Sequence, residues 1–158
     1  LKRLGFNVRG WSRRKKRVDG IQCFYGDDQI DSSLMDADIV VLLLPDTPLT
    51  QNILNQHTLN LLKRGAFVLN PGRGPLIDDD ALLAALESGQ IEHATLDVFR
   101  IEPLPKNHQY WSNNKVTVVP HKASETRPKT ASRVIAMNIR RAENGKELLY
   151  LVDRENGY

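Results

Sequence analysis

The stretch ADIVVLLL at residues 37–44 consists mostly of β-branched and leucine side chains and is bounded by Asp36 and Pro45. A strand that is exposed on one face alternates apolar and polar residues, and this stretch does not. It is therefore typical of a parallel strand whose two faces are both buried. We expect it to lie inside an α/β sheet.

Strand and helix signals alternate along the rest of the chain. The other expected strands are residues 7–11, 21–25, 66–70, 93–98 and 116–119. The expected helices are a segment capped by Asp27 or Asp28 that runs to Met35, and residues 54–62, 81–86 and 125–143. This alternation predicts a doubly wound, mostly parallel Rossmann-type sheet with helices on both faces.

The beginning of the chain departs from this pattern. Gly5 stands where a helix C-cap belongs, and no N-cap residue precedes it, so the chain is expected to start within an element. The sequence contains no G-x-G-x-x-G motif. The strand that normally comes before this motif is missing as well. In the strand order 3-2-1-4-5-6 the strand before that motif is central. We therefore expect the two strands on either side of the missing central strand to face each other across a gap. Such a sheet must rearrange or be completed.

Composition indicates one globular domain. The 158 residues are 41% hydrophobic, and the net charge of +3 comes mostly from the basic run at residues 13–17. Cys23 is the only cysteine, so we expect a buried thiol and a reducing compartment. The sequence shows no signal peptide and no run long enough to span a membrane, which predicts a soluble, cytoplasmic protein.

Ligands of such sheets bind at the carboxyl ends of the strands, where three polar residues are candidates for catalysis. Arg73 lies in a glycine-rich turn and could bind a carboxylate, unless it is an ordinary surface arginine. Glu102 is held by the following prolines, although a solvated loop glutamate would look the same. His121 ends a strand, where an acid-base group is expected, but a lone histidine is more often structural.

The three residues suggest more together than each does alone. A histidine must be protonated to donate to a ketone oxygen, and a neighbouring carboxylate favours its protonated form. An arginine, a histidine and an acid at one strand edge are suited to the reduction of a 2-oxoacid.

Four motifs occur in order: LPDTPLT at residues 44–50, NPGRG at 70–74 with LID at 76–78, LDVF at 96–99 through EPLP at 102–105, and Pro120-His121. With them, and down to VDRENGY at 152–158, the chain resembles the D-isomer-specific 2-hydroxyacid dehydrogenases. Within that family it most resembles the NADPH-dependent glyoxylate and hydroxypyruvate reductases. The resemblance implies a small 2-oxoacid substrate and a homodimer.

The resemblance also implies roles for individual residues. Arg73 would bind the substrate carboxylate and polarise its carbonyl, His121 would donate the proton, and Glu102 would partner His121. Asp97 would meet the nicotinamide carboxamide. The remaining residues expected to line the cofactor groove are Pro45, Pro71, Gly72 and Ala123. The histidines outside the motifs, His57 and His108, are expected at the surface.

The expected strand at residues 7–11 is followed by Ser12, Arg13 and Arg14, where an NAD-binding unit normally has an acid for the ribose hydroxyls. These residues suit a 2′-phosphate, which favours NADPH over NADH. A basic run can also be a nucleic-acid or localisation patch. No interleaved aromatic residues support that reading, so no nucleic-acid partner is expected.

Two departures from the family pattern matter. Lys122 stands where relatives usually have an apolar residue, and we expect it to point to solvent. The phosphate loop and the substrate domain are missing, so residues 1–158 are interpreted as a partial NAD(P)-binding domain with a C-terminal helix and tail.

The first hypothesis for the function of the protein is an NADPH-dependent reductase. The alternative is a catalytically silent remnant or a dinucleotide-sensing interaction module.

Overall fold

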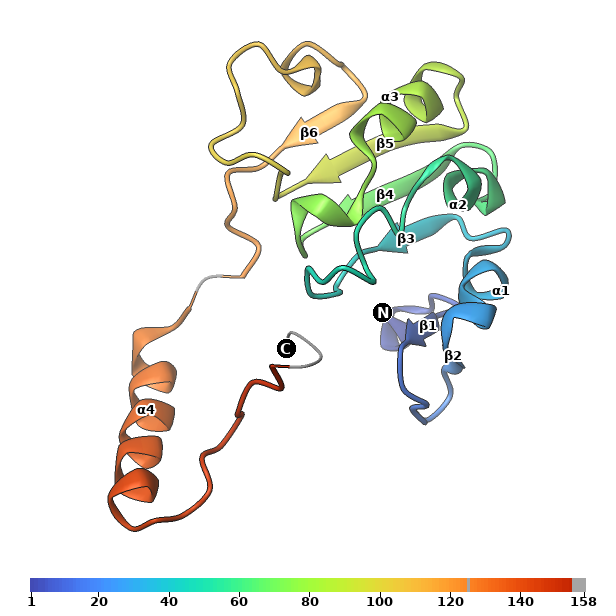
Figure 1. Cartoon of the computed structure of the whole chain (residues 1–158). Coiled ribbons are helices and arrows are strands. Elements are labelled where there is room, and N and C mark those ends of the chain that lie inside the picture. The colour runs from blue at the N-terminus through green and yellow to red at the C-terminus, as the bar shows by residue number, and fades with distance from the viewer. Residues whose placement is uncertain (125, 155–158) are drawn as a thin grey trace.

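The computed structural model describes residues 1–124 and 126–154 (Figure 1). The strands are β1 (Arg9–Ser12), β2 (Gln22–Tyr25), β3 (Ile39–Val41), β4 (Ala66–Asn70), β5 (Ile91–Leu96) and β6 (Val116–Val118). The α-helices are α1 (Ile30–Leu34), α2 (Gln56–Leu61), α3 (Asp79–Glu87) and α4 (Pro128–Glu143). Short 3-10 helices cover Lys2–Leu4, Asp27–Gln29, Gly74–Leu76 and Gln109–Trp111. The expected alternation of strands and helices is confirmed.

All strand pairs are parallel, but the strands form two separate sheets. One sheet pairs β1 with β2, and the other has the order β3-β4-β5-β6. The Rossmann-type α/β class is thus confirmed, and so is the interruption expected from the sequence. It falls between β1 and β3, the two strands that a central strand would join.

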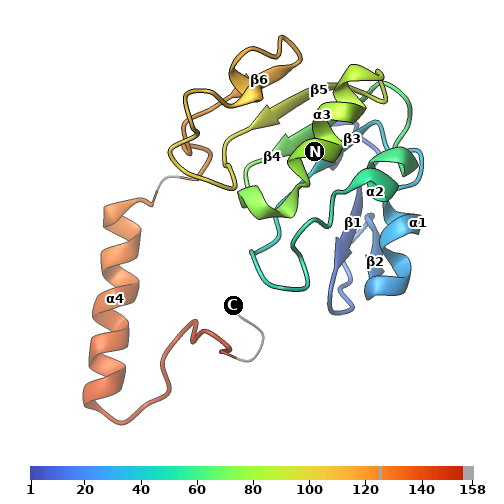
Figure 2. The same ribbon diagram turned by 45° about the horizontal axis from the view of Figure 1, so that its top comes forward.

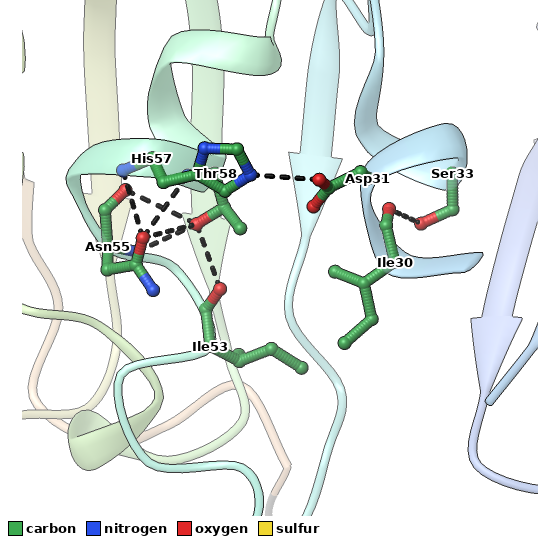
Figure 3. Close-up of polar contacts among 7 residues, drawn as sticks. All are labelled: Ile30, Asp31, Ser33, Ile53, Asn55, His57 and Thr58. Carbon is green, nitrogen blue, oxygen red and sulfur yellow. Dashed lines mark hydrogen bonds and ion pairs between the residues drawn. The ribbon is translucent and has the colours of Figure 1, made fainter. Parts of the chain in front are cut away.

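Helix α1 holds the two sheets next to each other. It contacts β1 and β2 on one side and α2 on the other. At the end of α1, the guanidinium of Arg9 donates to the carbonyl oxygen of Met35 at 2.7 Å. Between the helices, Nε2 of His57 lies 2.9 Å from a carboxylate oxygen of Asp31 (Figure 3). The connection between the sheets is therefore made by a helix and polar contacts rather than by strand pairing.

A capping box fixes the start of α2 (Figure 3). The side-chain oxygen of Asn55 accepts from the backbone N–H groups of His57 and Thr58, and the Thr58 hydroxyl accepts from the N–H of Asn55. These bonds satisfy donors that have no partner within the helix. The helix consequently begins at Gln56, two residues later than expected.

The hydrophobic core lies between one face of the four-stranded sheet and the helices α2 and α3. Val40, Val68 and Ala94 face the helices from the sheet, and Leu59 and Leu82 are among the helix residues packed against them. Successive residues of a strand point to opposite faces, so alternate positions along β3, β4 and β5 supply this layer. The core anchors the strand ends from which the site loops begin.

The opposite face of the same sheet is exposed, which corrects the expectation for residues 37–44. Ile39, Val41 and Phe67 are 46%, 39% and 44% exposed. Only the face that includes Val40 and Leu42 is buried. The physical reason is that α2 and α3 pack on the first face, and none of the described helices covers the second. β3 is also shorter than the apolar stretch.

Helix α4 stands apart from both sheets, as Figure 1 and Figure 2 show from two directions. None of its residues is buried, and the apolar side chains Ile135 and Ile139 are 60% and 55% exposed. The segment that follows folds back on it, because the amide of Asn138 exchanges two hydrogen bonds with the backbone of Leu149. Among the described residues, no helix is long and apolar enough to cross a membrane.

Several expected boundaries and caps are corrected. Neither Asp27 nor Asp28 caps a helix, because both lie within a 3-10 helix whose N-cap is Gly26. Helix α4 begins at Pro128, whose missing N–H costs nothing in a first turn, and not at Glu125, which lies outside the described residues. The remaining strands differ from the expected ranges by up to two residues at either end, and β5 ends at Leu96 rather than at Val98.

Two further expectations concerned Gly5, as a helix C-cap, and Cys23, as a buried thiol. Gly5 caps the first 3-10 helix in the left-handed conformation, with φ of 87°, as expected. Cys23 is half-buried rather than buried, because it lies on β2 of the small two-stranded sheet, outside the main core.

Candidate active site

The three candidate catalytic residues follow three adjacent parallel strands. Arg73 follows β4, Glu102 follows β5 and His121 follows β6. Because the strands are parallel, their carboxyl ends meet at one edge of the sheet. All three residues are exposed there. The topology thus places the arginine, the acid and the histidine on the same side of the molecule.

Glu102 and His121 are in direct contact. Nδ1 of His121 lies 2.8 Å from Oε2 of Glu102, and the two side chains are 49% and 35% exposed. The other carboxylate oxygen of Glu102 accepts from the backbone N–H of Phe99 at 2.9 Å. Both oxygens of the carboxylate are therefore held, one by the loop that carries it and one by the histidine.

The surroundings of Glu102 favour its ionised form. Partial burial raises the pKa of Glu102, but hydrogen bonds from His121 and the Phe99 N–H act in the opposite direction. The positive charges of a protonated His121 and of Arg73 lower it further, and the resulting pKa is below the ordinary value. Glu102 is consequently held in its anionic form, in contact with His121.

Asp97 holds the turn that carries His121. Its carboxylate oxygens accept from the backbone N–H groups of Lys122 at 2.7 Å and Ala123 at 2.9 Å. Its carbonyl accepts from the N–H of His121 at 2.9 Å. His121 has a left-handed φ of 50°, a conformation that costs a non-glycine residue on the order of 1 kcal/mol. These bonds hold that conformation in place.

This structural role of Asp97 was missed from the sequence. Asp97 is buried at the end of β5, next to the turn it anchors. An ionised carboxylate has about four acceptor positions, so both oxygens can accept further bonds. The contact between Asp97 and a nicotinamide carboxamide stays a prediction. Lys122 is exposed, as expected, and only its backbone N–H contacts Asp97.

Asn70 shapes the turn that carries Arg73. This fully buried residue ends β4, and its side-chain oxygen accepts from the N–H of Gly72 at 3.1 Å. Its amide nitrogen donates to the carbonyl of Arg73 at 2.9 Å. Sequence reasoning treated Asn70 only as part of a motif. The signal was available, because a polar residue that ends a buried strand before Pro-Gly must find partners for its amide.

Gly74 brings the arginine loop against the glutamate loop. A Cβ at this position would lie 1.9 Å from the carbonyl carbon of Phe99 and 2.3 Å from the backbone nitrogen of Arg100. No L-residue with a side chain fits there without a shift of the backbone. Gly74 therefore sets how closely Arg73 and Glu102 approach, a requirement that the sequence alone did not reveal.

The residues expected to line a cofactor groove follow β3, β4 and β6. Pro45 and Pro71 are half-buried, Gly72 is buried, and Ala123 is exposed. The loop after β3 is held by the Thr50 hydroxyl, which donates to the carbonyl of Pro45 at 2.7 Å. These positions share the sheet edge of the catalytic candidates, and their role in cofactor binding stays a prediction.

The three residues expected to select NADPH lie at the end of β1, in the other sheet. Ser12 and Arg13 are half-buried and Arg14 is exposed. The Ser12 hydroxyl donates its hydrogen to the carbonyl of Arg14 at 2.8 Å. The hydroxyl can donate to a ligand only if this bond is broken. The structure therefore brings these residues together with one another, but on a different sheet from Arg73, Glu102 and His121.

The two histidines outside the motifs differ from each other. His57 is exposed, as expected. His108 is half-buried, which corrects the expectation of a surface residue. Its Nδ1 accepts from the N–H of Tyr110 at 3.2 Å, and its ring centroid lies 4.5 Å from that of Tyr110. His108 caps the short helix Gln109–Trp111 and packs on a buried tyrosine.

Comparison with known proteins identifies the family of the chain. A family model described as D-isomer specific 2-hydroxyacid dehydrogenase, NAD binding domain, matches residues 1–123. The chain belongs to this family. The 2-hydroxyacid dehydrogenase chain is also 45% identical, over all of its length, to glyoxylate/hydroxypyruvate reductase A of Serratia proteamaculans, of which it covers 50%. It spans about half the length of the curated relatives it matches.

Solved structures of 2-hydroxyacid dehydrogenases match the whole described arrangement. One, from Xanthobacter autotrophicus Py2 in complex with NADPH and MES, is 47% identical with a TM-score of 0.96, and the match covers 99% of this chain and 64% of that one. Another is an NADPH-dependent glyoxylate/hydroxypyruvate reductase from Sinorhizobium meliloti in complex with NADP and sulfate. It is 34% identical with a TM-score of 0.93, over 99% of this chain and 51% of that one.

Proposed function

We propose that this chain is the cofactor-binding part of an NADPH-dependent reductase of glyoxylate, hydroxypyruvate or a similar small 2-oxoacid. The observation that carries the proposal is the contact between Glu102 and His121, with Arg73 on the adjacent loop. It combines a proton donor, an anion that favours the protonated donor, and a binder for a carboxylate. The names and ligands of the relatives support the same activity and cofactor.

The side chains have distinct tasks in this proposal. Arg73 binds the carboxylate of the 2-oxoacid and polarises the neighbouring carbonyl. When bound, NADPH would be the hydride donor for the carbonyl carbon. His121 transfers a proton to the carbonyl oxygen from Nε2, since Nδ1 faces Glu102. Glu102 stabilises the protonated ring before transfer, and the product is the 2-hydroxyacid.

The donor set at the end of β1 fits the 2′-phosphate of NADPH better than the free ribose hydroxyls of NADH. Two guanidinium groups, Arg13 and Arg14, and the Ser12 hydroxyl follow the strand where an NAD site would have a carboxylate. Arginine binds phosphate oxygens through several N–H groups in a fixed plane. Asp97, Pro45, Pro71-Gly72 and Ala123 are proposed to line the nicotinamide side of the groove.

The active enzyme needs parts that these 158 residues do not contain. We propose that residues 1–158 are part of the NAD(P)-binding domain, with its C-terminal helix and tail. A strand between β1 and β3, a glycine-rich phosphate loop and a substrate domain would complete it. The complete enzyme is proposed to be a cytoplasmic homodimer that acts on a small molecule and binds neither nucleic acid nor membrane.

Oxidation of NADPH in the presence of glyoxylate or hydroxypyruvate tests the activity. It should be measured for this chain and for a fusion that adds the part of the Serratia relative which the match leaves uncovered. We expect turnover in the fusion, loss of turnover in Arg73→Ala and His121→Ala, and none of these losses in Arg64→Ala or His57→Ala. A fusion that binds NADPH without any turnover would identify a dinucleotide-binding module and refute the reductase.

A further inference from the structure

The side chain of Arg100 connects the loops that follow three neighbouring strands. Its Nη2 donates to the side-chain oxygen of Asn52, after β3, and to the carbonyl of Ile77, after β4, each at 2.5 Å. Arg100 itself follows β5. Its Nε lies 3.9 Å from a carboxylate oxygen of Asp79, the first residue of α3. One guanidinium thus ties together the segments on which the candidate site is built.

Asp79, the acidic partner of Arg100, is itself held in place. The other carboxylate oxygen of Asp79 accepts from the hydroxyl of Tyr110 at 2.9 Å. Tyr110 is buried, and this burial together with the Asp79 charge raises the pKa of its hydroxyl far above the ordinary value, so it stays a donor. The Tyr110 ring also packs on Phe99, with centroids 6.5 Å apart. Asp79 therefore presents a fixed carboxylate to Arg100.

The position of Arg100 in the chain connects this anchor to the site. Its neighbour Phe99 donates its backbone N–H to Glu102, and Glu102 contacts His121. Gly74 packs against the backbone of Phe99 and Arg100 from the other side. If the guanidinium lost its partners, the segment from Phe99 to Glu102 would lose its hydrogen bonds to the loops that follow β3 and β4, and would keep the packing of Phe99 on Tyr110 and the backbone contact with Gly74.

We propose that Arg100 is a positioning residue, which holds the loop of residues 99–102 so that Glu102 faces His121. It acts through the loop, because its guanidinium is bonded to Asn52, Ile77 and Asp79 rather than to Glu102 or His121. Its consequence for catalysis rests on the proposed reductase function, but the positioning itself is a property of this chain. The competing interpretation is an arginine that adds only stability, since partly exposed ion pairs at such distances contribute little.

Titration of the Glu102 carboxyl carbon by NMR distinguishes these interpretations without any turnover. In Arg100→Met we expect the pKa of Glu102 to rise toward its ordinary value of 4.5, because the bonds from Phe99 and His121 are loosened. Arg64→Met is the matched control, since Arg64 makes one comparable bond, 2.7 Å to the carbonyl of Ser88. It should leave the Glu102 titration unchanged.

Two further variants separate positioning from the simple loss of a positive charge. Asn52→Gly keeps Arg100 but removes one of its acceptors, and glycine tolerates the left-handed φ of 53° at this position. Asn52→Asp keeps an acceptor oxygen. We expect the pKa of Glu102 to rise in Asn52→Gly and not in Asn52→Asp. An unchanged titration in Arg100→Met, which removes all three contacts of the guanidinium, overturns the proposal, and it does so independently of whether the fusion enzyme turns over.

Discussion

Gly74 and Phe99 lie closer together than any other residue type at position 74 would permit. Their backbones belong to the loops that carry Arg73 and Glu102, so a contact between two main chains sets the relative position of two catalytic candidates. Neither residue carries chemistry of its own.

Gly74→Ala should therefore destabilise the fold or separate the two loops. The added methyl group has no free space, and overpacking of this kind typically costs about 1–3 kcal/mol. Gly10→Ala is the control, because a Cβ there would meet only an ordinary contact with Ile21 at 4.0 Å. Urea unfolding of both variants measures the difference. Equal stability of the two would mean that the loops can move apart freely.

Asn70 should be needed for both of its hydrogen bonds. Asn70→Ala removes the partners of the Gly72 N–H and the Arg73 carbonyl, at a cost of about 1–3 kcal/mol for groups left unpaired near the core. Asn70→Asp keeps the acceptor but loses the donor, so we expect an intermediate free energy of unfolding. If Asn70→Asp were as stable as the unaltered chain, the bond to Arg73 would contribute nothing.

The lowered pKa of Glu102 predicts a definite dependence on pH. A group with a lowered folded-state pKa adds stability above its unfolded value, here 4.5, and the contribution is lost as the pH falls through the folded value. Glu102→Gln should then lower stability above that pH and have no effect in stronger acid. The effect should be small, about 0.2–1 kcal/mol, because the pair is partly exposed. Thermal unfolding of both proteins across pH tests this.

Asp97→Asn should release the turn that holds His121. The asparagine side chain has one oxygen, which can accept from the N–H of either Lys122 or Ala123. Its NH2 group would then face the N–H of the other residue, and both groups are donors. The amide NMR signals of both residues should shift, and stability should fall by about 1–3 kcal/mol. Asp80→Asn, an exposed change on α3, is the control. Unshifted amide signals in Asp97→Asn would contradict this account.

The sequence predicted the secondary-structure elements that are determined by contiguous residue patterns. The apolar stretch at residues 37–44 and the run before Asn70 predicted adjacent parallel strands, and the missing motif predicted the interruption between β1 and β3. The contact between Glu102 and His121 also agrees with the sequence, because the two motifs end neighbouring strands.

What the sequence did not reveal depends on contacts between distant segments. The closeness of Gly74 to Phe99 and the three partners of Arg100 arise only when loops from different strands meet. The exposure of Ile39 and Val41 has the same origin, since apolar composition cannot say which face of a strand is covered. The motif of Asp97 predicted a cofactor contact, which stays a prediction, but did not reveal that its carboxylate also accepts from the backbone of the turn that carries His121.

The core described above contains only residues between Val40 and Tyr110, and neither β1, β2 nor α4 contributes a buried side chain. The molecule is thus divided into regions of unequal resistance to opening. Amide protons in β4 and β5 should exchange with solvent only on global unfolding, whereas those in β1 and α4 should exchange through low-energy local fluctuations. The proposed 2′-phosphate site at the end of β1 therefore lies in the labile region, and a dinucleotide bound there would have to order it.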